Sequence, residues 1–304
     1  MISPQSQLSD LMVESFLVLR TTFFAAGMMA LTYRLRDKRN TQDDPLDEYI
    51  HTLLAEQLPT DTTCVKAPGP LITPDIVIMR PQACNSSSRT ELAIDLARIV
   101  GLEVKKLERS RGGAIARASG MDYNTTPPCG TVRIYDRNST ALDIRGFYLF
   151  VCQEVVPGQQ GYYRLSALAL CDGNLLNADF AYYLSIVGQR TKTVGLGTYG
   201  DGANRSRPML LFANPLGTAA LDYNVTLVHS RDDLAHEFPQ LRHIGCLRRT
   251  VPLIGVHTFH CYRVQQDVPA DHVAFDLLDP FPTPSRTEHT QPRGRFRINL
   301  QPVD

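Results

Sequence analysis

Two short stretches, PDIVIMRP at residues 74–81 and LEVKKLER at residues 102–109, carry the pattern that decides the fold. The first places Asp75 at the head of a run of β-branched residues, which predicts a strand. The second alternates apolar and charged residues at period two, which predicts a strand with one face in water. The two stretches therefore predict strands of a sheet, one opening on an acid and the other carrying several charges.

The second stretch combines an acid and a lysine on one face. By the period-two rule, Glu103 and Lys105 point to the same side while Val104 turns into the core. If the two strands are neighbours, the side chains of Asp75 and Glu103 come together. Two carboxylates can hold a divalent cation beside a scissile phosphate, and a nearby ammonium group can orient the water or neutralise charge. The backbone carbonyl of Val104 offers an additional metal ligand.

This order and spacing, PD followed after residues 76–102 by EVK, resembles the PD-(D/E)xK nuclease motif. The resemblance spans roughly residues 70–155 and implies a restriction-endonuclease-like core, a central mixed β-sheet flanked by helices. It also implies that Asp75 and Glu103 bind Mg²⁺ and that Lys105 assists the attacking water. The alternative is a Pro-Asp turn followed by an ordinary solvated strand face.

The bulk composition is compatible with a single nuclease domain of α/β class. The chain has 304 residues, 43% hydrophobic content and a formal net charge of zero, which argues weakly against histone-like wrapping of DNA and leaves room for a local basic cleft. We expect N-terminal helices over residues 1–60, a catalytic core over about 65–190, and recognition loops with short strands over about 191–304. No internal repeat or clear linker divides the chain.

The N-terminal apolar stretch reads as a buried helix over residues 8–36 ending in a basic cluster, because Glu14 and Arg20 are costly in a bilayer. We therefore expect no membrane partner. The seven cysteines, in a chain that shows no signal peptide, predict reduced thiols and a cytoplasmic location.

Further elements follow from periodicity and turn residues. Helices are expected in TQDDPLDEYIHTLLAEQL and ADFAYYLSIVGQ, and NSSSRTELAIDLARIV reads as a short helix, or else a strand, broken by Gly101. Strands are expected in TVRIYD, FYLFVCQEV, RLSALALC, PMLLFA, NVTLVH and GVHTFHCYRV. The helical glutamates Glu14 and Glu48 are weak candidates for a fourth acid and are left out of the site.

Two basic loops are candidate DNA contacts. The first follows the acid–lysine strand and has a glycine pair that suits close approach to a phosphate backbone. The second, GTYGDGANRSRPM, is glycine-rich and offers arginine for guanine and asparagine for adenine, although it is also good turn chemistry. The candidate DNA-binding residues are Lys106, Arg109, Arg111, Arg117, Asn204, Arg205 and Arg207.

A zinc site is the weaker hypothesis for the histidines and cysteines of the C-terminal half. His243, Cys246, His257, His260 and Cys261 have spacings that superficially suit zinc. However, His257 and His260 would point to opposite faces of a strand, and the chain has no CxxC knuckle. Scattered core or surface residues are therefore favoured.

The pattern as a whole predicts a Mg²⁺-dependent endonuclease that cuts double-stranded DNA at specific sites, most like a type II restriction enzyme. No dinucleotide, P-loop or serine-hydrolase motif is present, so no nucleotide cofactor is expected. A homodimer is implied by the resemblance, with the N-terminal helix either in its interface or in the monomer core. The alternatives are a repair or structure-specific nuclease, a non-catalytic DNA-binding protein, and a hydrolase of small phosphoesters.

Overall fold

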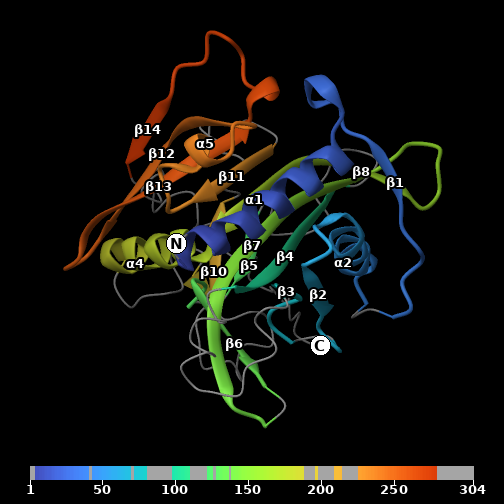
Figure 1. The fold of residues 1–304 in the computed structure, drawn as a ribbon, viewed down its shortest axis with the longest axis horizontal. Helices are drawn as coiled ribbons and strands as arrows, with labels where there is room; N and C mark the ends of the chain where they lie inside the picture. The colour runs from blue at the N-terminus through green and yellow to red at the C-terminus, as the bar shows by residue number, and fades with distance from the viewer. Residues whose placement is uncertain are drawn as a thin grey trace, which may run out of the picture.

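The fold is organised around a large mixed β-sheet, seen in the computed structural model of the chain (Figure 1). The structure describes residues 4–40, 43–69, 72–80, 98–109, 122–125, 128–136, 138–187, 196–197, 209–213 and 225–278. In these ranges the large sheet has eleven strands. They are β1 (Thr32–Arg34), β2 (Thr63–Lys66), β3 (Ile76–Met79), β4 (Ile99–Arg109), β6 (Thr131–Tyr135), β7 (Ala141–Val155), β8 (Tyr162–Asp172), β11 (Val225–His229), β12 (Leu241–Val251), β13 (Gly255–Val264) and β14 (Phe275–Leu278).

The strand order is β14-β12-β13-β11-β8-β7-β4-β3-β2, with β1 paired to β8 and β6 to β7. The pairs β4–β7, β8–β11 and β12–β14 are parallel, and the other pairs are antiparallel. A separate three-stranded sheet contains β5 (Asp122–Thr125), β10 (Met209–Ala213) and β9 (Leu196–Gly197). The expected α/β class with a mixed sheet is confirmed.

Few helices cover this sheet. They are α1 (Pro4–Phe23), α2 (Pro45–Gln57), α4 (Gly173–Val187) and the short α5 (Leu234–Glu237), with 3₁₀ turns η1 (Ala26–Met28) and η5 (Gln265–Asp267). Figure 1 shows α1 lying across the sheet and α2 next to the edge that β2, β3 and β4 form. Among the described helices, none is long and apolar enough to cross a bilayer.

The core is divided between the two faces of the sheet, as alternation along β7 shows. Phe147, Leu149 and Val151 belong to a buried cluster that includes α1 and α2. Tyr148 and Phe150, between them in sequence, belong to a second cluster that includes α4. A strand buried on both faces reads as a nearly continuous apolar run, which is why FYLFVCQEV was recognisable as a strand.

The N-terminal helix is shorter than predicted. It ends at Phe23, and the chain then turns through Gly27, which has a φ of 70°, and forms β1. The Arg20 guanidinium donates to the carbonyls of Phe24 and Ala25 and pairs with the buried Asp267 of η5. Arg20 thus holds the segment that follows α1, because its guanidinium binds backbone carbonyls just beyond the end of the helix.

The apolar side of α1 faces its own sheet. Leu11, Met12, Phe16 and Leu19 are fully buried within the cluster shared with α2. Of the two places considered for this helix, the monomer core and a subunit interface, the core is the one observed.

Gly101 does not end the preceding element, as the sequence suggested, because β4 begins at Ile99 and runs through Gly101 into LEVKKLER. A Cβ at Gly101 would lie 2.4 Å from Val132 and 3.0 Å from Pro74. The missing side chain therefore allows close packing above the strand and does not mark a turn.

The C-terminal half differs from the expected loops with short strands. β12 and β13, eleven and ten residues long, extend the same large sheet, and β12 was not predicted. A register shift between His243 and Gly245 interrupts its alternation, which hides the strand period from the sequence. Of the element predicted over residues 85–100, residues 85–97 lie outside the described residues, and residues 99 and 100 begin β4.

Candidate active site

The two predicted acids lie next to each other where β3 begins. β3 and β4 are antiparallel with Ile76 opposite Leu102, so Asp75, one residue before β3, lies opposite Glu103. The Asp75 carboxylate accepts a hydrogen bond of 2.7 Å from the backbone N–H of Val104. The Asp75 side chain thus extends the hydrogen bonding between β3 and β4 by one position, and this bond holds the carboxylate against β4.

Glu103 and Lys105 share a face of β4, as period two predicted. The Lys105 Nζ lies 2.7 Å from Glu103 Oε1, and their side chains are 22% and 10% exposed. Val104, between them, is buried with the residues that pack beneath α1 and α2. Asp75, Glu103 and Lys105 are therefore brought together.

The site has oxygen atoms suited to a hard divalent cation. Glu103 Oε2 is buried and has no hydrogen-bond partner among the described residues, which is unusual for a carboxylate oxygen. The N–H and C=O of one residue in a strand point to the same side, so the Val104 carbonyl faces the same open side as its N–H. β3 pairs with β4 only as far as Leu102, so this carbonyl lies beyond the end of the β3 ladder. Two carboxylates and a carbonyl fit the ligand preferences of Mg²⁺.

Burial and a nearby negative charge both disfavour the ionised form of the Asp75 carboxyl group. Burial and the neighbouring Glu103 carboxylate raise the pKa of Asp75 to about 7, against the opposing effects of the Val104 N–H and Lys105. Buried like charges disfavour the ionised form unless a cation compensates them. A bound divalent cation would supply that compensation.

The N-terminus of α2 adds two acids that sequence reasoning did not assign to the site. Burial, followed by the charges of Asp75 and Asp44, raises the pKa of Asp47 to about 8. Asp44 caps α2 by accepting from the Leu46 N–H and also contacts Lys106 at 2.8 Å. The acidic start of TQDDPLDEYIHTLLAEQL was the available signal, but only the tertiary structure brings it to β3.

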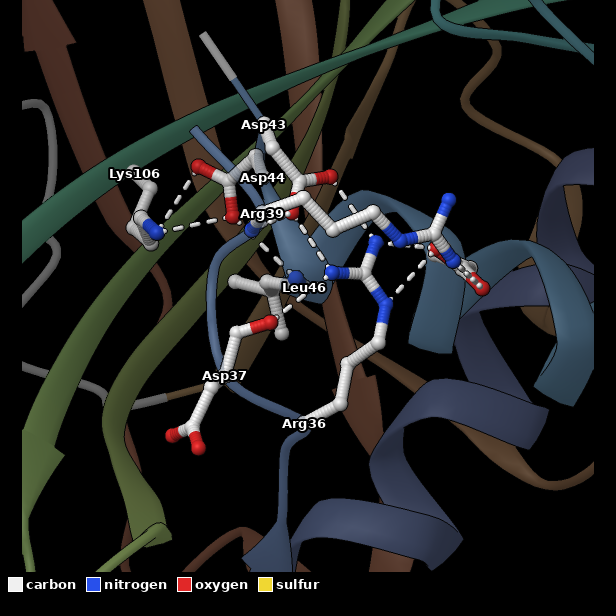
Figure 2. Close-up of polar contacts among 8 residues, drawn as sticks. Arg36, Asp37, Arg39, Asp43, Asp44, Leu46 and Lys106 are labelled. Atoms are coloured by element: carbon white, nitrogen blue, oxygen red, sulfur yellow. Dashed lines mark hydrogen bonds and ion pairs between the residues drawn. The ribbon is translucent and has the colours of Figure 1, made fainter. Parts of the chain in front are cut away.

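The two glutamates that were left out of the site, Glu14 and Glu48, are bound by arginines elsewhere. Figure 2 shows Arg36 and Lys106 contacting the neighbouring Asp43 and Asp44 from opposite sides. Arg36 also binds Glu48. Glu14 lies against Arg80, with Oε2 2.7 Å from the guanidinium.

The DNA-contact predictions are mostly outside the described part of the chain. Arg111, Arg117, Asn204, Arg205 and Arg207 lie outside the described residues, and the side chain of Arg109 is not described although its backbone belongs to β4. Lys106 is described, and its ammonium group is held in the ion pair with Asp44. Its contact with DNA stays a prediction.

Three of the five residues weighed for zinc lie close together, whereas a scattered arrangement was favoured from the sequence. His243, Cys246 and His260 lie together on β12 and β13, so they are not scattered residues. The exposed His257 is not part of this group, in agreement with the expected opposite orientation of His257 and His260.

Comparison with protein-family models, with curated proteins and with solved structures finds no match for this chain. Any function of this chain must therefore be inferred from the chemistry of its own residues.

Proposed function

We propose that this chain is a Mg²⁺-dependent endonuclease that cuts double-stranded DNA at specific sites, of the type II restriction kind. The observation that carries the proposal is the meeting of Asp75 and Glu103 on adjacent strands. One buried oxygen of Glu103 lacks a partner among the described residues, and Lys105 lies 2.7 Å from the other.

Asp75, Glu103 and the Val104 carbonyl are the proposed ligands. When held by these ligands, Mg²⁺ would supply positive charge to lower the pKa of a water molecule and to offset charge that develops on the phosphate. The Val104 N–H fixes the Asp75 carboxylate. Lys105 orients the attacking water or neutralises developing charge, which is the electrostatic role expected of an ammonium group beside a phosphate.

Recognition and assembly form the second part of the proposal. The basic residues that follow β4 and the loop around Asn204 are proposed to contact the DNA backbone and bases. A homodimer would match the two-fold symmetry of a palindromic site and cut both strands. Because α1 is buried in the core of its own chain, the dimer interface is proposed to use another surface.

The test is a digest of a fully sequenced phage DNA. Wild-type protein is incubated with Mg²⁺, with Mn²⁺ and with EDTA, beside Asp75→Asn and the control Asp143→Asn. Asp143 is an exposed acid on β7 paired with Arg133, so the control removes a carboxylate outside the site. We expect discrete fragments only with divalent metal, from wild type and Asp143→Asn but not from Asp75→Asn.

Each outcome decides a different part of the proposal. A metal-dependent smear would keep the nuclease and overturn its site specificity. Equal cleavage by Asp75→Asn would overturn the assignment of this site. Absence of cleavage with either metal, from protein with a cooperative unfolding transition, would overturn the nuclease proposal.

A further inference from the structure

Three metal-binding side chains from β12 and β13 form a compact cluster far along the sheet from Asp75. The His260 Nδ1 lies 3.3 Å from the His243 Nε2. The Cys246 sulfur lies 3.6 Å from that same His243 nitrogen and 3.5 Å from His260 Nδ1. The three donor atoms therefore form a nearly equilateral triangle.

A β-bulge makes this triangle possible. His243 and Cys246 are three residues apart, so in a regular strand they would point to opposite faces. The register shift between His243 and Gly245 inserts one extra residue, and Cys246 then lies opposite His260 on the same face as His243. Gly245 is required there because a Cβ would lie 2.5 Å from the Phe275 ring of β14.

The triangle has the dimensions of a tetrahedral zinc site. With Zn–N bonds of about 2.0–2.1 Å and Zn–S bonds of about 2.3 Å, tetrahedral ligands are separated by about 3.3 Å for two nitrogens and about 3.6 Å for nitrogen and sulfur. The observed separations of 3.3, 3.5 and 3.6 Å match these values. All three donors could thus bind one ion without rearrangement of the hairpin.

The surroundings leave room for a fourth ligand. All three side chains are half-buried, so the site can be reached from solvent. Asp232, on the loop between β11 and α5, does not belong to this group, so solvent is the source of the fourth ligand.

We propose that His243, Cys246 and His260 bind one Zn²⁺, with water in the fourth position. Two imidazoles and a thiolate favour a borderline-soft ion over Mg²⁺, which prefers oxygen. The Cys246 thiol loses its proton to the solvent when the metal binds. The ion would join β12 to β13, so zinc is expected to stabilise this part of the sheet, and the inference does not depend on the nuclease proposal.

The test is a Co²⁺ titration of the full chain without a polyhistidine tag. Stoichiometric binding should give the visible absorption of tetrahedral Co²⁺ and a near-ultraviolet sulfur-to-cobalt charge-transfer band, both displaced by Zn²⁺. Cys246→Ser should abolish the charge-transfer band, and His260→Gln should weaken binding at least about a hundredfold, since even outer partners of a metal site change affinity by about 10–100-fold. The matched controls are His257→Gln on the same strand and Cys64→Ser, another half-buried free thiol.

A second measurement needs no variant. Zn²⁺ should slow the alkylation of Cys246 in wild-type protein by at least about tenfold, as located by peptide mass spectrometry, while that of Cys64 stays unchanged. The proposal is overturned if Co²⁺ binds without a charge-transfer band, if Cys246→Ser retains the wild-type spectrum, or if Zn²⁺ leaves Cys246 alkylation unchanged.

Discussion

The two candidate metal sites differ in ligand chemistry and in how the chain builds them. The site at Asp75 and Glu103 presents carboxylate and carbonyl oxygens on two regular antiparallel strands. The cluster at His243, Cys246 and His260 presents nitrogen and sulfur across a bulged hairpin. Oxygen ligands suit Mg²⁺ and phosphate chemistry, whereas nitrogen and sulfur suit zinc. On regularly paired strands, the spacing of site residues in the sequence shows which of them share a face. A β-bulge inserts a residue and removes that correspondence.

The largest expected effect tests whether the sites are separate. Glu103→Gln should lower DNA cleavage about a thousandfold, roughly 4 kcal/mol of transition-state stabilisation, because it removes a charged Mg²⁺ ligand. The same variant should keep the Co²⁺ charge-transfer band. Cys246→Ser should lose that band and retain cleavage within about tenfold of wild type. One variant that removes both properties would show that the sites are coupled.

The adjacent lysines of β4 sharpen the description of the first site. Lys105→Ala should lower the single-turnover cleavage rate about a hundredfold, since its ammonium group lies beside Glu103. Lys106→Ala should lower cleavage less than tenfold, and through DNA affinity, because Asp44 holds the Lys106 Nζ. Single-turnover rates at saturating and limiting protein separate the two effects. If both variants lost the same cleavage rate at saturating protein, the different roles assigned to Lys105 and Lys106 would be contradicted.

Each of the two candidate metal sites has a nearby glycine that packs closely against other residues. Gly101→Ala would push against Val132 and against Pro74, which precedes Asp75, while Gly245→Ala would push against Phe275. Overpacking of this kind costs about 1–3 kcal/mol of unfolding free energy. Urea denaturation should show both losses, but only Gly101→Ala should impair cleavage and only Gly245→Ala should weaken Co²⁺ binding. The reverse pairing would refute the assignment of either glycine to its site.

The smallest effect is a pH dependence of stability that belongs to the oxygen site. The pKa values of Asp75 and Asp47 are raised to about 7 and about 8, above the value of about 3.9 expected in an unfolded chain. The folded state therefore binds more protons than the unfolded state between about pH 4 and 8, and stability falls as pH rises through that window. In EDTA, the unfolding free energy should therefore fall as the pH is raised from 5 to 8.

The matched variants for this pH dependence are Asp75→Asn and Asp143→Asn. Asparagine keeps an acceptor for the Val104 N–H and removes the buried charge, so Asp75→Asn should flatten the profile. Asp143→Asn removes an exposed acid and should leave the slope between pH 5 and 8 unchanged. A wild-type profile that rises over the same window would contradict the sign derived for these carboxylates.

The sequence by itself determined the features that depend on local periodicity. Alternation in LEVKKLER fixed the common face of Glu103 and Lys105, and the apolar runs of β7 and β8 identified buried strands. The capped start of α2 was equally local, because Asp44 and the proline after it are adjacent in the chain. These features follow from side-chain spacing on a strand or helix, which neighbours elsewhere do not alter.

Only the tertiary structure decided the features that require distant segments to meet. It brought Asp47 from α2 toward Asp75, joined the end of α1 to η5 through the pairing of Arg20 with Asp267, and placed β12 in the large sheet. It also set His243 and Cys246 on one face through the bulge before Gly245. These features depend on the path of the chain in space or on one residue inserted in a strand. Neither can be read from the linear pattern of apolar and polar residues.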